Sequence, residues 1–254
     1  MRARVASTSA LTAILAAGCA SGVPESTTVA GDCADFYGAD ACTWATLTAT
    51  NDVTEFGVTI PLASIERAPH DAEMVWPPVL VATVNLPAAV NAAMGVDHLT
   101  VYWEPHGHPP GAYLTPHFDF HFYNIATATR EAIDCSDLTK PTDLPAGYRL
   151  IDVDIPDVGM LVGLCVPAMG MHALLGSEVE SDDIFDGTMV IGYYRGSPIL
   201  FEPMIARDML MRRQSFDLPM PTVSPLPAGV RYPQSFRAEY DAAADAYRFT
   251  FAGV

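Results

Sequence analysis

The sequence predicts a mainly β fold, either an antiparallel barrel or a sandwich, with one or two short covering helices. Several short segments alternate apolar and polar residues with a period of two, which is typical of strands that bury one face. The 21 prolines and 18 glycines separate these segments, as in strand-rich folds. Half of the residues are hydrophobic, which is enough for a sizeable core. Because no break in composition divides the chain, residues 46–254 are expected to form one domain.

Strands are expected in the segments that combine this alternation with β-branched or aromatic residues. These segments are residues 53–60, 79–86, 98–104, 117–124, 148–155, 188–196 and 198–203. The last residues, 235–254, are expected to form a closing hairpin. Aromatic side chains alternate there on both sides of a turn of small residues, from Phe236 to Tyr240 and from Tyr247 to Phe251.

Helical signals are fewer. Residues 87–95 are rich in alanine and end in Gly95, which suits the C-terminal end of a helix. Residues 202–213 are the second predicted helix, with Pro203 in the first turn and two arginines at the end where cations complement the helix dipole. Both helices are expected to cover the β structure.

Residues 1–18 are predicted to be a signal peptide of the lipoprotein type. Two arginines precede an alanine-rich apolar run that is shorter than the roughly 20 residues needed to span a bilayer. The segment LAAGC (15–19) resembles a bacterial lipobox with its leucine one place early, so Cys19 is the candidate for lipidation. Residues 19–45 are then expected to form a tether and an N-terminal disulfide loop. Plain secretion is the alternative, so the domain is expected to be an outer-membrane lipoprotein or a periplasmic or secreted protein.

The cysteines that follow the signal segment are even in number, which in an exported chain predicts disulfides. They are Cys33, Cys42, Cys135 and Cys165. Pairing Cys33 with Cys42 and Cys135 with Cys165 closes one short and one longer local loop, and this pairing is the one we expect. Buried free thiols are the alternative.

The charge balance restricts the partners. Lysine and arginine total 13 against 30 acidic residues, which gives a formal net charge of −17. Such a surface argues against binding nucleic acid, whose phosphates need the opposite charge. It favours cationic partners, and a membrane would be contacted only through a lipid anchor. The sequence does not determine the oligomeric state.

The stretch WEPHGHPPGAYLTPHFDFHFYN (103–124) holds four of the seven histidines of the chain. Its second half has a period of two, so a strand there places aromatic and polar side chains on opposite faces. Phe118, Phe120 and Phe122 share the face expected to be in the core. The opposite face carries His117, Asp119 and His121.

Strand geometry limits how these histidines can act together. His117 and His121 lie four residues apart, or roughly 13 Å along a straight strand, so they can share one ion only across a bulge or strong twist. Asp119, between them, is either a ligand or the carboxylate that orients a histidine. His106 and His108 are two residues apart, and the following Pro-Pro-Gly turns the chain, which places this pair on an adjacent element.

Nitrogen and oxygen ligands of this kind favour a divalent transition metal, zinc first, then copper, iron, nickel or manganese. The candidate metal ligands are His108, His117, His121 and His172. His172 follows a Met-Gly approach, and Glu202 is expected at a strand-to-helix junction. A set of hydrogen-bonded histidines without metal is the alternative. His70 and His98 have no supporting neighbours in the sequence.

Several motifs, in this order, resemble an uncharacterised family of mostly exported bacterial proteins with a Thermus representative, known only as a domain of unknown function. The segments that carry the resemblance are FGVTI (56–60), GHPPGAY (107–113), PHFDFHFY (116–123), MGMH (169–172) and FEPMIA (201–206). The resemblance covers roughly residues 50 to 254 and implies a β fold with a metal centre. It places in the family motifs His108, His117, Asp119, His121, His172 and Glu202. His106 matches no fixed histidine, Ala173 stands where the family usually has an aromatic residue, and the resemblance lends no reaction.

Three functions remain open. The first is an exported metal-binding protein in which four protein ligands close the coordination sphere of a structural or cargo ion. The second is a metal-dependent hydrolase, in which a metal-bound water is activated with Asp119 or Glu202 as general base. The third is a binder of a small apolar ligand in a barrel mouth. Neither Gly-x-Ser-x-Gly nor His-Glu-x-x-His occurs, so those hydrolase classes are excluded.

Overall fold

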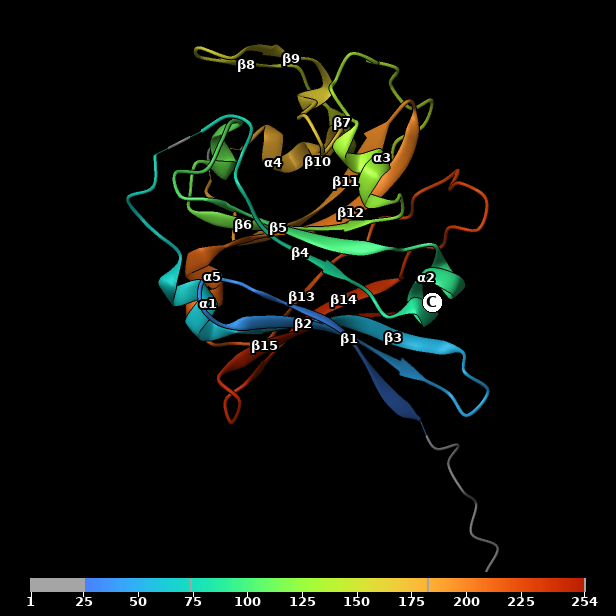
Figure 1. The fold of residues 1–254 in the computed structure, drawn as a ribbon. Coiled ribbons are helices and arrows are strands. Elements are labelled where there is room, and N and C mark those ends of the chain that lie inside the picture. Colours follow the sequence, from blue (N-terminus) through green and yellow to red (C-terminus); the bar gives the residue numbers. More distant parts are fainter. Residues whose placement is uncertain (1–25, 74, 182, 254) are drawn as a thin grey trace, which may run out of the picture.

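The computed structural model of the protein describes residues 26–73, 75–181 and 183–253. It shows two antiparallel sheets packed face to face as a sandwich, which confirms the predicted fold class (Figure 1). The predicted signal segment 1–18 and the lipidation candidate Cys19 lie outside the described residues. None of the helices within the described ranges is both long enough and apolar enough to cross a bilayer.

The first sheet contains both ends of the described chain. In spatial order its strands are β1 (Thr27–Asp35), β2 (Asp40–Leu47), β3 (Val53–Pro61), β15 (Ala246–Ala252), β14 (Ser235–Asp241) and β13 (Phe216–Leu218). The expected C-terminal hairpin is therefore β14 and β15, and it pairs with β3 in the middle of the sheet. Strands β1 and β2 occupy part of the segment expected to be a tether and disulfide loop.

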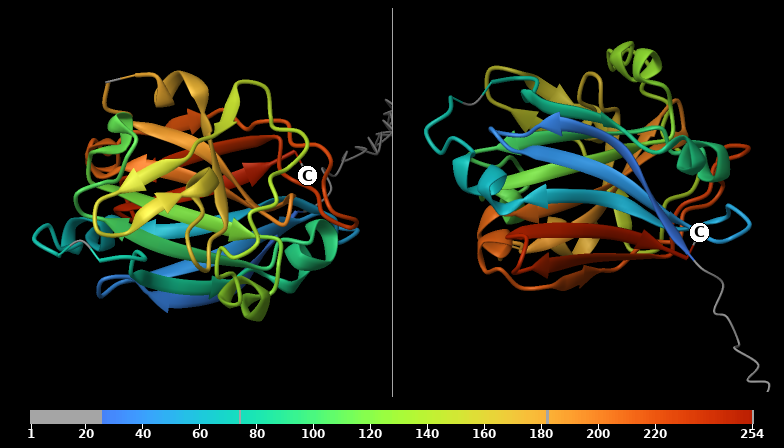
Figure 2. Two further views of the ribbon diagram at one scale, coloured as in Figure 1. Left: turned by 90° about the horizontal axis from the view of Figure 1, so that it is seen from above. Right: turned by 60° about the horizontal axis from the view of Figure 1, so that its bottom comes forward.

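The second sheet carries the histidine-rich strand near its centre. Its strands, in spatial order, are β4 (Leu80–Asn85), β5 (His98–Glu104), β6 (His117–Tyr123), β12 (Ser197–Ala206), β11 (Gly187–Tyr194), β10 (Met171–Leu175) and β7 (Tyr148–Leu150). A separate small hairpin consists of β8 (Val153–Ile155) and β9 (Gly159–Leu161) and lies over the outer face of this sheet (Figures 1 and 2). The expected strand 148–155 is thus divided between β7 and β8.

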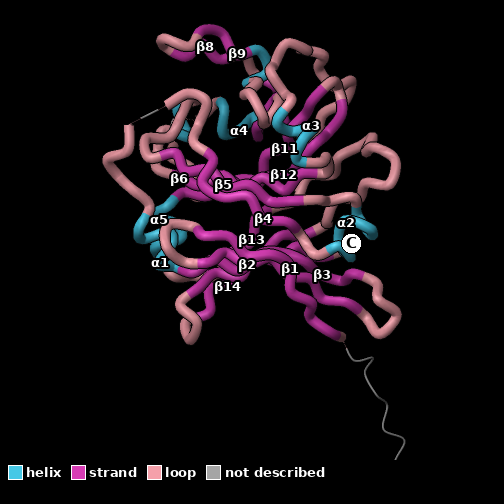
Figure 3. Tube along the Cα trace, in the orientation of Figure 1, coloured by secondary structure: helices cyan, strands magenta, loops and turns pink. Residues whose placement is uncertain are grey.

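The helices are short and lie at the ends and edges of the two sheets (Figure 3). They are α1 (Leu62–Arg67), α2 (Ala88–Met94), α3 (Thr127–Glu131), α4 (Gly176–Val179) and α5 (Arg207–Met211), with single 3₁₀ turns η1 (Gly111–Tyr113) and η2 (Val162–Leu164). The prediction for 87–95 is confirmed by α2, which ends at Gly95 in the left-handed conformation.

The prediction of a helix over 202–213 is wrong in its first half. Strand β12 continues through Ala206, and only Arg207–Met211 is helical. Residues 202–205 pair with β11 on one side, where Val190 faces Glu202. On the other side the ladder to β6 resumes at Met204, beyond Pro203, which has no N–H to donate. Tertiary pairing therefore overrides the helical spacing of the apolar residues.

The inner faces of the sheets meet in an aromatic core. Phe122 of β6 stacks on Phe201 of β12 with ring centroids 5.4 Å apart and an interplanar angle of 2°. Phe251 of the opposite sheet lies 4.7 Å from Phe122 and 5.0 Å from Phe201, and all three side chains are fully buried. The phenylalanine face of β6 thus points into the sandwich, so the histidine face of the same strand must point outward.

Both expected disulfides are present. Cys33–Cys42 joins β1 to β2, and Cys135–Cys165 joins two loops over the outer face of the second sheet. Two disulfides fit an oxidising compartment of the kind that exported proteins enter.

Candidate metal centre

The outer face of the second sheet collects acidic and imidazole side chains from neighbouring strands. The register places Glu104 of β5 opposite His117 of β6, and Tyr102 opposite Asp119. On the other side of β6, Met204 of β12 faces Asp119. Alternation along each strand therefore brings these polar side chains to one surface, although every residue of β5 and β6 is buried.

Two groups of three residues have donor atoms close enough to hold an ion. His108, His117 and Asp119 form the first triad, and within it one ligand atom from each residue lies within 4.8 Å of the others. The second triad, defined by the same limit, consists of His121, His172 and Glu202. His117 and His121 thus belong to different triads, as their spacing on a strand requires.

Glycines allow the two histidines outside β6 to reach these triads. Gly107, before His108, has a φ of +65°, and a Cβ there would collide with the carbonyl oxygen of Tyr113. Gly170 precedes β10, the strand of His172, with a φ of +89°, and a Cβ would press against the carbonyl of Tyr193. Only glycine accepts both the left-handed conformation and the close approach.

The first triad has both rings fixed by backbone carbonyls. His117 Nδ1 lies 2.7 Å from the carbonyl oxygen of Thr115, and His108 Nδ1 lies 2.9 Å from that of Pro109. A carbonyl oxygen can only accept, so each Nδ1 carries the hydrogen. The Nε2 atom of each neutral ring is therefore the free lone pair that a metal ion requires.

The rings of the second triad are fixed in the same tautomer. His172 Nδ1 donates to the carbonyl oxygen of Leu164 over 3.0 Å. His121 Nδ1 lies 3.1 Å from the hydroxyl of Tyr123, which donates its own hydrogen to the carbonyl of Ala168 over 3.3 Å. The hydroxyl therefore accepts from His121, and again Nε2 is left free.

The free nitrogens face carboxylate oxygens instead of hydrogen-bond donors. His117 Nε2 lies 3.4 Å from Asp119 Oδ1, and His121 Nε2 lies 3.3 Å from Glu202 Oε1. His172 Nε2 is 3.9 Å from Glu202 Oε2. Among the described residues, several buried atoms here have no hydrogen-bond partner: Glu104 Oε1, His117 Nε2, Asp119 Oδ1, His121 Nε2 and Glu202 Oε2. Facing acceptors need a proton or a cation between them.

Burial favours the neutral form of His117 and of His172. It lowers the pKa of His172, and it lowers the pKa of His117 well below the ordinary value, with a further contribution from neighbouring His108. Burial also raises the pKa of Asp119 well above its usual range, and nearby Glu202 adds to this rise. Neutral rings with free Nε2 atoms are the form of histidine that binds metal.

The structure also shows where the remaining histidines lie. His106 is exposed and its Nε2 is 3.0 Å from the carbonyl of Ala72, so it lies outside both triads. His98 is buried, 3.0 Å from Asp97, and stacked on Tyr123. Glu202 lies within β12 instead of at the expected strand-to-helix junction.

Glu104 is the residue of this centre that sequence reasoning missed. Its side chain is buried beside the first triad, and burial, followed by the charge of Glu202, raises its pKa to about 8. The one available signal was a single acid at the end of the apolar strand 98–104. The carbonyl groups that fix the rings have no sequence signal, because every residue has a carbonyl.

The two triads lie beneath a cavity of about 420 Å³. Its lining includes Glu104, His108, Asp119, His172 and Glu202, together with apolar side chains from covering loops. Ions held by the triads would therefore lie at the floor of a space large enough for a small molecule.

Comparisons with known proteins assign neither a family nor a function to this chain. Comparisons with protein-family models, with curated proteins and with solved structures give no match. The function is therefore argued from the geometry of the centre.

The raised pKa of Glu104 makes the stability of the metal-free protein depend on pH. Its folded-state pKa of about 8 exceeds the ordinary value of 4.5, so it stabilises the fold at low pH and that stability is lost as pH rises toward 8. Asp119 acts in the same direction. His117 and His172, whose pKa values are lowered, reduce the stability of the fold only as the pH falls below about 6.5. We therefore expect the free energy of unfolding to fall between about pH 6.5 and pH 8.

Urea unfolding at several pH values across this window measures the effect. Glu104→Gln should flatten the decline, and the exposed substitution Glu239→Gln should leave it unchanged. Equal slopes for the wild type and Glu104→Gln would show that Glu104 is not the group responsible.

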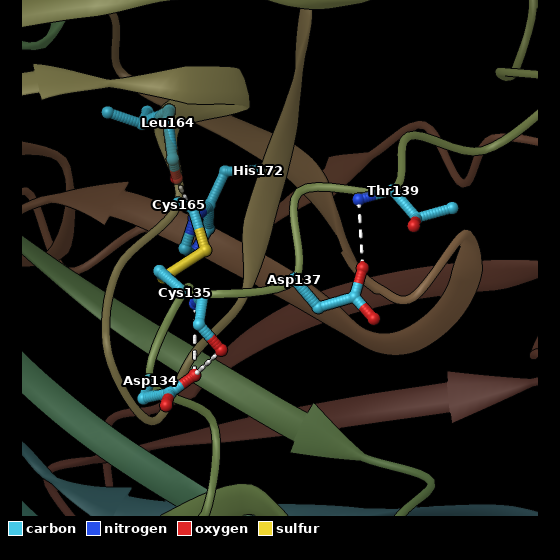
Figure 4. The surroundings of a disulfide bond; sticks show 8 residues. Asp134, Cys135, Asp137, Thr139, Leu164, Cys165 and His172 are labelled. Carbon is cyan, nitrogen blue, oxygen red and sulfur yellow. Dashed lines mark hydrogen bonds between the residues drawn. A yellow bond between two sulfur atoms is a disulfide. The ribbon is translucent and has the colours of Figure 1, made fainter.

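The Cys135–Cys165 disulfide supports the second triad (Figure 4). Leu164, which accepts the hydrogen bond from His172, is adjacent to Cys165. Ala168, which holds Tyr123 and through it His121, donates its N–H to the carbonyl of Ile133 near Cys135. One disulfide-bonded segment thus orients both rings of the second triad and neither ring of the first.

Replacing Cys135 and Cys165 together by serine is therefore expected to weaken metal binding at the second triad by about 10- to 100-fold. Affinity at the first triad should stay the same, because its carbonyl partners, Pro109 and Thr115, belong to the loop between β5 and β6. Competition with a chromophoric chelator measures both affinities. The Cys33→Ser/Cys42→Ser double variant is the matched control, and an equal loss in both double variants would contradict the specific role.

Proposed function

We propose that this is an exported metal-binding protein that holds a divalent transition metal, zinc first, at each of its two triads. The observation that carries the proposal is the shared tautomer: four rings are fixed through Nδ1, which leaves each Nε2 free. The Nε2 atoms of His117, His121 and His172 lie 3.3 to 3.9 Å from buried carboxylate oxygens. Two imidazoles and one carboxylate form a donor set suited to zinc and to other borderline ions.

The alternative of hydrogen-bonded histidines without metal fits the geometry less well. A hydrogen-bonded set would pair each Nε2 with a donor, whereas His117 Nε2 and His121 Nε2 have no partner among the described residues. A proton held by Asp119, whose pKa burial raises well above its usual range, would bridge only the His117–Asp119 pair. Burial lowers the pKa of His117 and of His172, which disfavours imidazolium at those two rings. A cation at each triad satisfies the facing acceptors at once.

Export and membership of the uncharacterised family are parts of the same proposal. The two disulfides support an oxidising compartment, and the segment around Cys19 supports a lipid anchor as the attachment to a membrane. All six motif residues of the resemblance fall in the two triads, which supports it. The acidic surface supports a partner other than nucleic acid.

Zinc titration of metal-free protein tests the proposal. Isothermal calorimetry against a competing chelator should show saturable binding, with up to one equivalent for each of the two triads. Heat changes no larger than those of dilution, in protein that circular dichroism shows to be folded, would overturn it.

A metal-dependent hydrolase is the second candidate, and the ligand count favours it over storage. Structural zinc sites are closed by four protein ligands, whereas catalytic sites use three and leave a position for water, whose pKa the ion lowers to about 7. Each triad here has three candidate ligands and adjoins a cavity. Since Asp119 and Glu202 belong to the triads, Glu104 is the better placed general base, because it lines the cavity from outside both.

A further inference from the structure

The cavity above the triads combines a polar floor with apolar walls. The floor is the outer face of the second sheet, with its carboxylates and imidazoles. The walls come from the covering loops and from the sheet beyond the triads, and include Trp76, Ile155, Leu164, Val166, Met169 and Met204. A volume of about 420 Å³ lies within the range of small-molecule sites, about 300 to 1,000 Å³.

Two exposed valines also line the cavity. Val75 and Val158 are 47% and 37% exposed, so they lie where the cavity meets solvent, and the exposed Asp157 lines it next to Val158. Val158 lies in the β8–β9 hairpin, which stands over the outer face of the second sheet (Figures 1 and 2). A molecule entering the cavity therefore passes apolar side chains before it reaches the floor.

The charges of the lining disfavour ligands that carry several negative charges. Among the described lining residues four are acidic and none is lysine or arginine; the acids are Glu104, Asp119, Asp157 and Glu202. Phosphate and sulfate esters carry full negative charges that these carboxylates repel, and no lysine or arginine among the described lining residues offsets the repulsion. With one divalent ion at each triad, the ions become the only positive charges at the floor.

We propose that this cavity takes a small molecule with an apolar body and a single oxygen-donor head group, such as a carbonyl or hydroxamate, that reaches the metal centre. This inference rests on the proposed metal function. The body lies against Trp76, Val166 and Met169, which pack together with Tyr102. The head group reaches the floor, where the ions are the only partners that favour an oxygen donor over water.

Hydroxamic acids of different chain length test the two halves of the proposal separately. Octanohydroxamic acid has an apolar body and a metal-binding head group, and acetohydroxamic acid has the same head group almost without a body. With zinc-loaded protein, calorimetry should show the octanoyl compound binding tighter by about tenfold or more, because each buried methylene adds affinity. Octyl phosphate should bind no better than acetohydroxamic acid.

Variants assign the effect to the cavity. Trp76→Ala should remove most of the advantage of the octanoyl compound while the zinc stoichiometry stays at the wild-type value. Leu138→Ala, which removes an exposed apolar side chain outside the cavity, should change neither quantity.

The outcomes separate this inference from the metal function. Zinc binding with equal affinities for the two hydroxamic acids, or tight binding of octyl phosphate, would overturn the ligand class and leave the metal sites standing. Tight binding of the octanoyl compound that persists in Trp76→Ala would also overturn it, because the body would then lie elsewhere. Absence of zinc binding would overturn the proposed function itself.

Discussion

Replacing His117 by alanine is expected to remove the ion from the first triad and leave the second loaded, and His121→Ala is expected to do the reverse. Each substitution deletes one of three candidate ligands and leaves a buried carboxylate without its cation. The affinity at the altered triad should fall below detection at micromolar metal. Zinc content after dialysis, measured for each variant separately, gives the result.

His70→Ala is the matched control, because it removes an exposed histidine that belongs to neither triad. It should keep the full zinc content. If His117→Ala and His121→Ala each lose all of the metal, the two triads form one interdependent centre. That result would contradict the expectation that each triad binds its ion independently.

The second large effect concerns stability. Phe251→Ala is expected to lower the free energy of unfolding by about 3 to 5 kcal/mol, because it leaves a cavity among packed rings. Phe251 is fully buried and lies within 5.3 Å of Phe56, Phe122, Phe201 and Phe236, measured between ring centroids. Urea unfolding at fixed pH and zinc concentration measures the loss.

Phe251 belongs to the sheet that does not carry the metal centre, so the folded variant should bind zinc like the wild type. Phe216→Ala, at a half-buried position in the edge strand β13, should cost much less. A loss below about 1 kcal/mol for Phe251→Ala would mean that the aromatic cluster does not hold the two sheets together.

The central strand shows what the sequence could predict. The alternation in PHFDFHFY assigns three phenylalanines to one face and His117, Asp119 and His121 to the other, and β6 has this arrangement. The same spacing predicts that His117 and His121 cannot share an ion on a regular strand. Both inferences need only the alternation of side chains along a single β-strand, so they do not depend on how the strands are arranged in the sheet.

Other parts of the centre depend on the order of the strands in the sheet, which could not be predicted from the sequence. His172 joins His121 because β10, β11, β12 and β6 are consecutive neighbours in the sheet, although the two residues are far apart in the chain. Glu104 faces His117 only through the register of β5 with β6. The helical spacing after Glu202 was misleading, since pairing in the sheet extends β12 through Ala206.

Elemental analysis of the exported protein tests the central claim most directly. The chain should be directed to the periplasm, purified without a polyhistidine tag, and compared with a His117→Ala/His121→Ala double variant prepared in the same way. We expect bound transition metal in the wild type, approaching one ion for each of the two triads, and its loss in the folded double variant. A wild-type protein that contains no metal and takes up none when zinc, copper, iron, nickel or manganese is offered would contradict the account.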